Sequence, residues 1–146
     1  MGEGAMIRKF QKPDIHRVAG IWLSVNREAH DFISAQYWQD HFESVKEMIL
    51  QAEVYVYESG NGTIQGFVGL SGDYIAGIFV CAEAQSNGIG SMLLNFVKNG
   101  KNRLSLNVYQ KNIRAVKFYQ REDFVIQSEN MDDSTGEREY FMVWER

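Results

Sequence analysis

The stretch "QSNGIG", from Gln85 to Gly90, lies between the strand-like run "YIAGIFV" (residues 74–80) and a segment with helical periodicity. A glycine-containing loop that opens a helix exposes backbone N–H groups at the positive helix end, where a pyrophosphate binds well. Gly88 and Gly90 also lack a Cβ atom, so phosphate oxygens can approach the main chain closely. A plain turn is an equally good interpretation of these six residues, because neither the dinucleotide fingerprint nor the P-loop is matched.

Working outward from this loop, the pattern predicts strands and helices in one domain, residues 6–146, after a short N-terminal extension, residues 1–5. The expected strands are residues 6–10, 53–59, 63–72, 74–80, 103–109, 123–129 and 138–145. Helices are expected from residue 13, from about residue 35 to residue 50, after Gly90 and over residues 112–122. The inward positions of the third helix are Ile89, Met92, Leu93, Phe96 and Val97. This order indicates a mixed α/β fold with about four helices around a mostly antiparallel sheet.

Composition excludes several classes of protein. The 146 residues are 45% hydrophobic and carry a net charge of −4, which is typical of a soluble globular domain and gives a nucleic-acid partner no support. The single cysteine, Cys81, excludes an internal disulfide and an all-cysteine metal site, and it fits a reducing cytoplasm. No apolar run reaches the length of a membrane span. We therefore expect a cytoplasmic monomer or homodimer without a metal ion and without a membrane or nucleic-acid partner.

A second motif, "NIRAVKFYQREDF" (residues 112–124), follows "LSLNVYQK" (residues 104–111). Together with "QSNGIG" it resembles the GCN5-related N-acetyltransferase (GNAT) family, most of all the small bacterial acetyltransferases of the YiaC and YjaB type. The resemblance implies a GNAT-like acyl-CoA N-acyltransferase fold, splayed between residues 74–80 and 103–109. It also implies acetyl transfer from acetyl-CoA to a primary amine by direct attack in a ternary complex. The matching positions are Gln85, Gly88, Gly90, Asn112, Ala115, Phe118 and Tyr119, with Phe124 in the following strand.

The same resemblance assigns the acetyl-CoA site. The loop is expected to bind the pyrophosphate, and the main chain of residues 78–80 to pair with the pantetheine arm and hold the oxyanion. Ser86 and Asn87 replace basic residues often found in this loop. A cationic helix face, otherwise simply solvated, is therefore a candidate to hold the 3′-phosphate: Lys111, Arg114, Lys117 and Arg121. The expected acetyl-CoA-binding residues are Ile78, Phe79, Val80, Gln85, Ser86, Asn87, Gly88, Ile89, Gly90, Ser91, Asn112 and Tyr119.

Tyr119 is the candidate general acid. Helical periodicity alone favours a core position for it, whereas the family resemblance places it beside the thioester sulfur. A phenol with an ordinary pKa near 10 stays protonated at neutral pH and can donate to a departing thiolate. Asn112 is both an N-cap candidate and, by resemblance, a coenzyme A contact. The alternative function is a catalytically silent coenzyme A-binding sensor or interaction module, against which the intact Tyr119 argues.

The general base is open, because Asn107 stands where many protein-acetylating relatives have Glu. His30, in the polar break "AHDF" (residues 29–32), is a candidate base or acceptor-site residue; a helix-capping histidine and a water relay are the alternatives. Cys81 is expected to be a buried small hydrophobe rather than a nucleophile. The expected acceptor is a protein lysine or N-terminal amine, a small-molecule amine, or an antibiotic. Three aromatic residues are expected either to line its site or to pack the neighbouring helix: Phe32, Tyr37 and Trp38.

Overall fold

The computed structural model describes residues 4–146, so residues 1–3 of the predicted extension lie outside it. Seven strands form one sheet in the order β1-β2-β3-β4-β5-β7-β6. The strands are β1 (Met6–Lys9), β2 (Glu53–Glu58), β3 (Ile64–Ser71), β4 (Tyr74–Val80), β5 (Arg103–Tyr109), β6 (Val125–Met131) and β7 (Arg138–Glu145). The helices are α1 (Ile15–Ala29), α2 (Ala35–Asp40), α3 (Phe42–Gln51), α4 (Ile89–Lys98) and α5 (Ile113–Arg121), with 3-10 turns η1 (Lys12–Asp14) and η2 (Ala82–Ala84). The predicted mixed α/β fold is confirmed.

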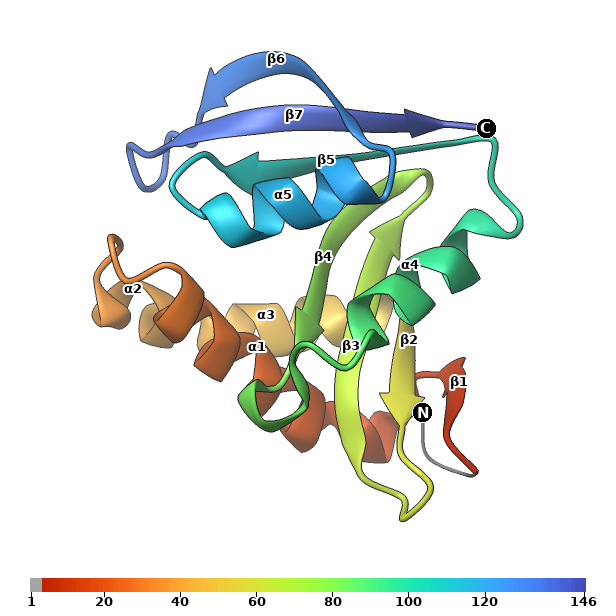
Figure 1. The fold of residues 1–146 in the computed structure, drawn as a ribbon. Coiled ribbons are helices and arrows are strands. Elements are labelled where there is room, and N and C mark those ends of the chain that lie inside the picture. The colour runs from red at the N-terminus through yellow and green to blue at the C-terminus, as the bar shows by residue number, and fades with distance from the viewer. Residues whose placement is uncertain (1–3) are drawn as a thin grey trace.

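The sheet opens between its two central strands, β4 and β5. They form its only parallel pair within residues 4–146, and their register joins Tyr74 to Ser105 and Ile75 to Leu106. Beyond these two pairs the strands diverge (Figure 1), whereas β3 pairs with β4 from Ser71 back to Gly66. The second half of β4 therefore has a neighbour on one side only, and its other edge faces the opening.

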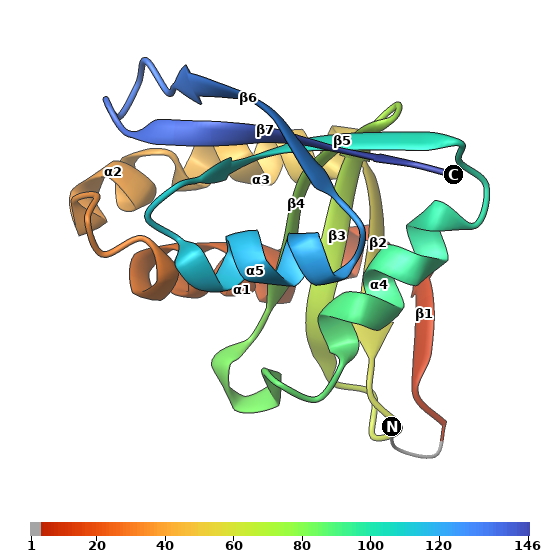
Figure 2. The same ribbon diagram turned by 45° about the horizontal axis from the view of Figure 1, so that its top comes forward.

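Helices pack on both faces of the sheet. In Figures 1 and 2, α1 and α4 approach β3 and β4 from opposite faces, while α5 lies along β5. The core between these layers is fully buried at Val18 of α1, Val68 of β3 and Leu93 of α4. Within residues 4–146, no helix combines the length and the apolar character that a membrane crossing requires.

The helix expected over residues 35–50 is two helices, and this raises the number of helices from about four to five. The break is at His41, whose ring Nδ1 lies 2.7 Å from the carbonyl oxygen of Tyr37. The backbone N–H of His41 is shared between the carbonyl oxygens of Tyr37 at 3.3 Å and Trp38 at 3.2 Å, so the last turn of α2 tightens and the helix ends there. Trp38 of α2 and Ile49 of α3 are both buried, so the two short helices still pack their apolar sides into the core.

The inward stripe of α4 also differs from the prediction, since Met92 is only partly buried and Phe96 is exposed. Phe96 is 40% exposed and packs its ring against Tyr55 of β2, with 4.9 Å between ring centroids. Leu94 is fully buried instead, in a helix that packs against β2, β3 and β4. The buried residues of this helix are Ile89, Leu93, Leu94 and Val97.

Candidate active site

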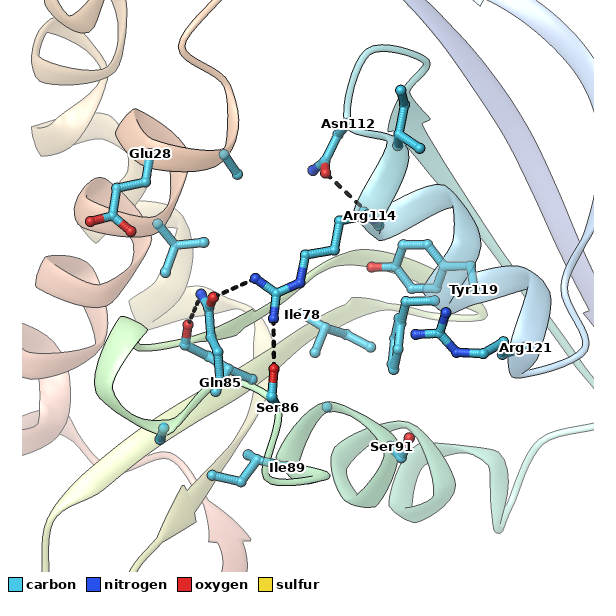
Figure 3. Close-up of a pocket in the computed structure, with 18 of the residues that line it drawn as sticks. Glu28, Ile78, Gln85, Ser86, Ile89, Ser91, Asn112, Arg114, Tyr119 and Arg121 are labelled. Carbon is cyan, nitrogen blue, oxygen red and sulfur yellow. Dashed lines mark hydrogen bonds between the residues drawn. The ribbon is translucent and has the colours of Figure 1, made fainter.

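A cavity of about 760 Å³ lies where the sheet opens. Its walls are the C-terminal half of α1, the second half of β4, the loop that leads into α4, and the first two turns of α5 (Figure 3). These elements are far apart in the sequence and meet because α1 and α4 pack against the same two strands. The cavity is therefore a product of the splay between β4 and β5.

The loop before α4 turns sharply at two residues with positive φ. Ser86 has φ 69° and Gly88 has φ 80°, a left-handed conformation that glycine adopts without strain. Gly88 is the N-cap of α4, and the start of this helix lines the cavity. No atom lies within 4 Å of the point that a Cβ on Gly88 would occupy. The positive end of α4 thus faces open space that an anion can enter.

Gly90 serves a different purpose from Gly88. A Cβ atom on Gly90 would lie 3.3 Å from Cζ of Phe118, so the missing side chain lets α4 and α5 approach each other. Glu122, at the end of α5, also joins the two helices through hydrogen bonds. Its carboxylate accepts a hydrogen bond from Ser91 Oγ of α4 at 3.0 Å, and its backbone carbonyl accepts one from Lys98 Nζ of α4 at 2.7 Å. The gap between the two helices is therefore fixed by packing and by hydrogen bonds.

A chain of hydrogen bonds crosses from β4 to α5 over the loop (Figure 3). Gln85 Nε2 donates to the carbonyl oxygen of Val80 at 3.0 Å. Gln85 Oε1 accepts from Arg114 Nη1 at 2.8 Å, and Ser86 Oγ accepts from Arg114 Nη2 at 3.1 Å. The Gln85 side chain therefore bonds to the end of β4 and to the Arg114 guanidinium of α5 at the same time.

Tyr119 lines the cavity from α5 and is 8% exposed. Its ring packs between Phe118 and Phe124. Burial, with a smaller contribution from Tyr74, raises the pKa of the Tyr119 hydroxyl well above its ordinary value near 10. The hydroxyl has no hydrogen-bond partner among residues 4–146, so it is free to donate to a bound molecule. Tyr119 is thus a core residue by its ring and a cavity residue by its hydroxyl.

His30 lies at the C-terminal end of α1, where its backbone N–H bonds to the carbonyl oxygen of Asn26. Its ring links two helices, with Nδ1 2.9 Å from Asn26 Oδ1 and Nε2 3.0 Å from Asn112 Nδ2. Asn112 also caps α5, since its Oδ1 accepts a hydrogen bond from the backbone N–H of Ala115. Burial lowers the pKa of His30 to about 4. This geometry favours the helix-end alternative for His30 over the role of general base.

Most of the predicted acetyl-CoA-binding residues come together at the cavity. Two do not line it: the ring of Phe79 turns away and stacks on Phe67, with 5.0 Å between centroids, and Asn87 is exposed on the loop. The sequence analysis missed the α1 wall, made by Val25, Glu28 and Ala29. The predicted residues that line the cavity are Ile78, Val80, Gln85, Ser86, Gly88, Ile89, Gly90, Ser91, Asn112 and Tyr119.

A second cluster of polar and aromatic side chains surrounds the end of β5. Tyr109 packs its ring against His30, with 4.9 Å between centroids, and donates its hydroxyl proton to Asp132 at 2.5 Å. Tyr37 of α2 hydrogen-bonds to Ser134 in the turn between β6 and β7 at 2.9 Å. Sequence patterns do not reveal such contacts, because Tyr37 and Ser134 are 97 positions apart.

None of the three aromatic residues expected near the acceptor lines the cavity in the part of the chain that the structure describes. Trp38 is 6% exposed and packs against Trp22, as a core residue does. Phe32 and Tyr37 are more exposed, and Phe32 packs against Tyr109. Cys81 is buried, as expected, and burial raises the pKa of its thiol. In the described range, residues 4–146, no three metal-binding side chains gather in one place.

Comparison with known proteins agrees with this architecture. A family model described as an acetyltransferase (GNAT) domain matches residues 51–126. The chain is 35% identical over 141 residues to peptidyl-lysine N-acetyltransferase YiaC of Escherichia coli (strain K12), which covers 95% of this chain and 96% of that protein. It is 26% identical over 130 residues to peptidyl-lysine N-acetyltransferase YjaB of Salmonella typhimurium, with 89% and 90% covered.

Solved structures show the same fold. The solution structure of the apo form of YjaB from Escherichia coli matches with a TM-score of 0.86 and 23% identity, over 96% of this chain and 97% of that one. The PaiA N-acetyltransferase of Thermoplasma acidophilum, solved in complex with coenzyme A, matches with a TM-score of 0.80 and 17% identity, over 97% and 99%. The chain therefore belongs to the GNAT family and is an acetyl-CoA-dependent N-acetyltransferase.

Proposed function

We propose that this enzyme transfers the acetyl group of acetyl-CoA to the ε-amine of a protein lysine, in the cavity between α1, β4, α4 and α5. The observation that carries the site is the hydroxyl of Tyr119, which is unpaired in the described range and lines the same cavity as the start of α4. The choice of acceptor is supported by the 35% identity to a peptidyl-lysine N-acetyltransferase over 95% of the chain. The unpaired Cys81 supports a reducing compartment, the cytoplasm.

The residues around the cavity fit acetyl-CoA. The start of α4, after Gly88, offers backbone N–H groups to the pyrophosphate. The edge of β4 from Ile78 to Val80 lies open to the cavity and offers main-chain groups to the amides of the pantetheine arm. This edge leads from the loop towards Tyr119, so a ligand anchored at α4 would bring its thioester to the phenol.

The proposed reaction is a direct attack. The neutral amine nitrogen attacks the thioester carbonyl carbon, a C–N bond forms, and a backbone N–H of β4 stabilises the oxyanion. When the C–S bond breaks, the thiolate takes the proton of the Tyr119 hydroxyl. The new amide releases the proton of the attacking nitrogen to solvent, and the Tyr119 phenolate takes a proton back from solvent. The raised pKa of Tyr119 keeps the phenol protonated at neutral pH, so the proton is in place before the C–S bond breaks.

Deprotonation of the incoming amine is assigned to water. Asn107 has no proton-accepting group, and its Nδ2 donates to the hydroxyl of Tyr74 at 2.8 Å. His30 has a pKa of about 4 and a ring nitrogen already bound by Asn112. The amine can lose its proton before or during binding, provided that the cavity is open to solvent.

The acceptor is tested with a thiol-release assay on acetyl-CoA. Lysine-containing peptides, the same peptides with lysine replaced by arginine, and spermidine serve as acceptors, and mass spectrometry locates the acetyl group. Acetylation of the lysine ε-amine, with none on the arginine peptides, supports the proposal. Turnover with spermidine alone would instead assign a small-molecule amine as the substrate.

A further inference from the structure

The guanidinium of Arg114 is held over the cavity by neutral partners only. Its two hydrogen bonds go to the amide oxygen of Gln85 and the hydroxyl of Ser86. A guanidinium has five N–H donors, so three remain without a protein partner among residues 4–146. No carboxylate forms an ion pair with Arg114 in that range, although the protein carries a net charge of −4. By contrast, Lys111 on the same side of the cavity is paired with Glu137 at 3.1 Å.

Hydrogen bonds at the protein surface orient this cation before any ligand binds. Gln85 is itself anchored on Val80, so the partner that orients the guanidinium cannot swing freely. Ser86 lies two residues before Gly88, and the fork of Arg114 therefore lies beside the loop that leads to the start of α4 (Figure 3). The only carboxylate labelled at the cavity, Glu28, is on the opposite α1 wall. The positive side of the cavity is thus the side formed by the loop and α5.

We propose that Arg114 binds the pyrophosphate of acetyl-CoA from the α5 side, opposite the backbone N–H groups of α4. The assignment rests on the acetyl-CoA placement proposed above. The loop contains no lysine or arginine between Gln85 and Ser91, so its own side chains supply no charge to the phosphates. A planar fork with spare donors binds phosphate oxygens in pairs and more strongly than neutral donors do. Arg114 supplies from α5 the charge that the loop lacks.

Arg114→Gln tests this inference, with the dissociation constant of coenzyme A measured by calorimetry. The loss of a charge-assisted contact should weaken binding by about 10- to 100-fold. Arg103→Gln is the matched control, because Arg103 is an exposed arginine at the start of β5 that does not line the cavity. Ser86→Ala removes one support of the fork but no charge, so only a few-fold change is expected. Circular dichroism verifies that each variant is folded.

Two further arms separate this role from its alternatives. Dephospho-coenzyme A lacks the 3′-phosphate, so a pyrophosphate contact predicts the same loss for both ligands in Arg114→Gln. A charge contact also predicts that the difference between wild type and variant shrinks at high salt, because salt screens it. Unchanged affinity in Arg114→Gln overturns the inference. A loss of affinity for coenzyme A but not for dephospho-coenzyme A also overturns it, because Arg114 would then bind the 3′-phosphate. An equal loss of affinity in Ser86→Ala overturns it as well, because Arg114 would then act by holding the loop and not by its charge.

The outcome is distinguishable from a failure of the proposed site itself. Gly88→Glu places a carboxylate at the start of α4 and tests the site without touching Arg114. If Gly88→Glu abolishes binding while Arg114→Gln does not, the acetyl-CoA site stands and the role of Arg114 is wrong. If both variants bind coenzyme A normally, the placement of the cofactor is wrong as well.

Discussion

Nδ2 of Asn112 donates a hydrogen bond to Nε2 of His30 over 3.0 Å, and this contact fixes the tautomer of the histidine. The orientation of Asn112 is set because its Oδ1 accepts from the N–H of Ala115. Asn26 is set in the same way, since its Nδ2 donates to the carbonyl of Trp22 at 2.9 Å and leaves Oδ1 for the histidine. His30 is therefore neutral, with the proton on Nδ1 and the lone pair of Nε2 used by Asn112.

The first prediction follows for the pH dependence of the rate. If His30 only positions Asn112 and α5, His30→Ala should lower the rate without removing a titration near neutrality, because the pKa of His30 is about 4. His30→Gln, whose amide oxygen can accept from Asn112, should recover part of the rate. Loss of the acidic limb in His30→Ala would restore His30 as the general base. His16→Ala, at an exposed histidine of α1, is the control.

The second prediction concerns stability against pH. An unfolded histidine has its pKa near 6.5, whereas folded His30 has it near 4, so the unfolded chain binds more protons between these values. The free energy of unfolding should therefore fall as the pH is lowered from 6.5 to 4. Denaturant titrations should show a shallower fall in His30→Ala than in wild type or His16→Ala. Equal slopes in the three proteins would contradict the buried neutral histidine.

The third prediction is that Gly88→Glu abolishes acetyl-CoA binding. The new carboxylate would lie at the start of α4, in space that the phosphates need, and would repel them. Backbone strain also contributes, because φ is 80° at this residue. Gly62→Glu controls for it, since Gly62 has φ 85° in the β2–β3 turn and also has open space around its Cβ position. Calorimetry should show lost binding in the Gly88 variant only.

The fourth prediction concerns the acid. Tyr119→Phe keeps the ring packed between Phe118 and Phe124 but removes the proton, so kcat should fall by about 10²- to 10⁴-fold. The affinity for acetyl-CoA should change little. Tyr57→Phe, at a buried tyrosine of β2 that does not line the cavity, should leave kcat unchanged. Turnover near the wild-type rate in Tyr119→Phe would assign protonation of the thiolate to water.

The fifth prediction tests the packing of α4 on α5. Gly90→Ala gains helix propensity but brings a Cβ atom to 3.3 Å from Phe118, and the two effects oppose each other. Phe118→Leu removes the contacting ring atom, so Gly90→Ala should be more favourable by about 1 kcal/mol when it is combined with Phe118→Leu. Thermal melts of the two single variants and the double variant measure this coupling. Additive effects would show that the two helices do not constrain each other.

The sequence by itself determined the elements and the motif positions. Every expected strand is present, Asn112 caps α5 as predicted, and the loop from Gln85 to Gly90 opens a helix. These features depend on contacts within a few residues of each other, such as N-caps, glycine conformations and alternation, and such contacts are written in the order of the residues. The break at His41 escaped the pattern because histidine is not a helix-breaking residue type, and its contacts with the carbonyl oxygens of Tyr37 and Trp38 appear only in the folded chain.

Only the tertiary structure decided what the side chains do. The sequence pattern allowed Tyr119 to lie either in the core or at the site. In the folded chain its ring is buried in the core and its hydroxyl lines the cavity. His30 was a candidate base until folding brought Asn112, 82 positions away, to its Nε2 and buried the ring. Arg114 became a partner of Ser86 only when α5 packed against α4. Burial and long-range contacts set the pKa values and free donors of a site, and neither exists before the chain folds.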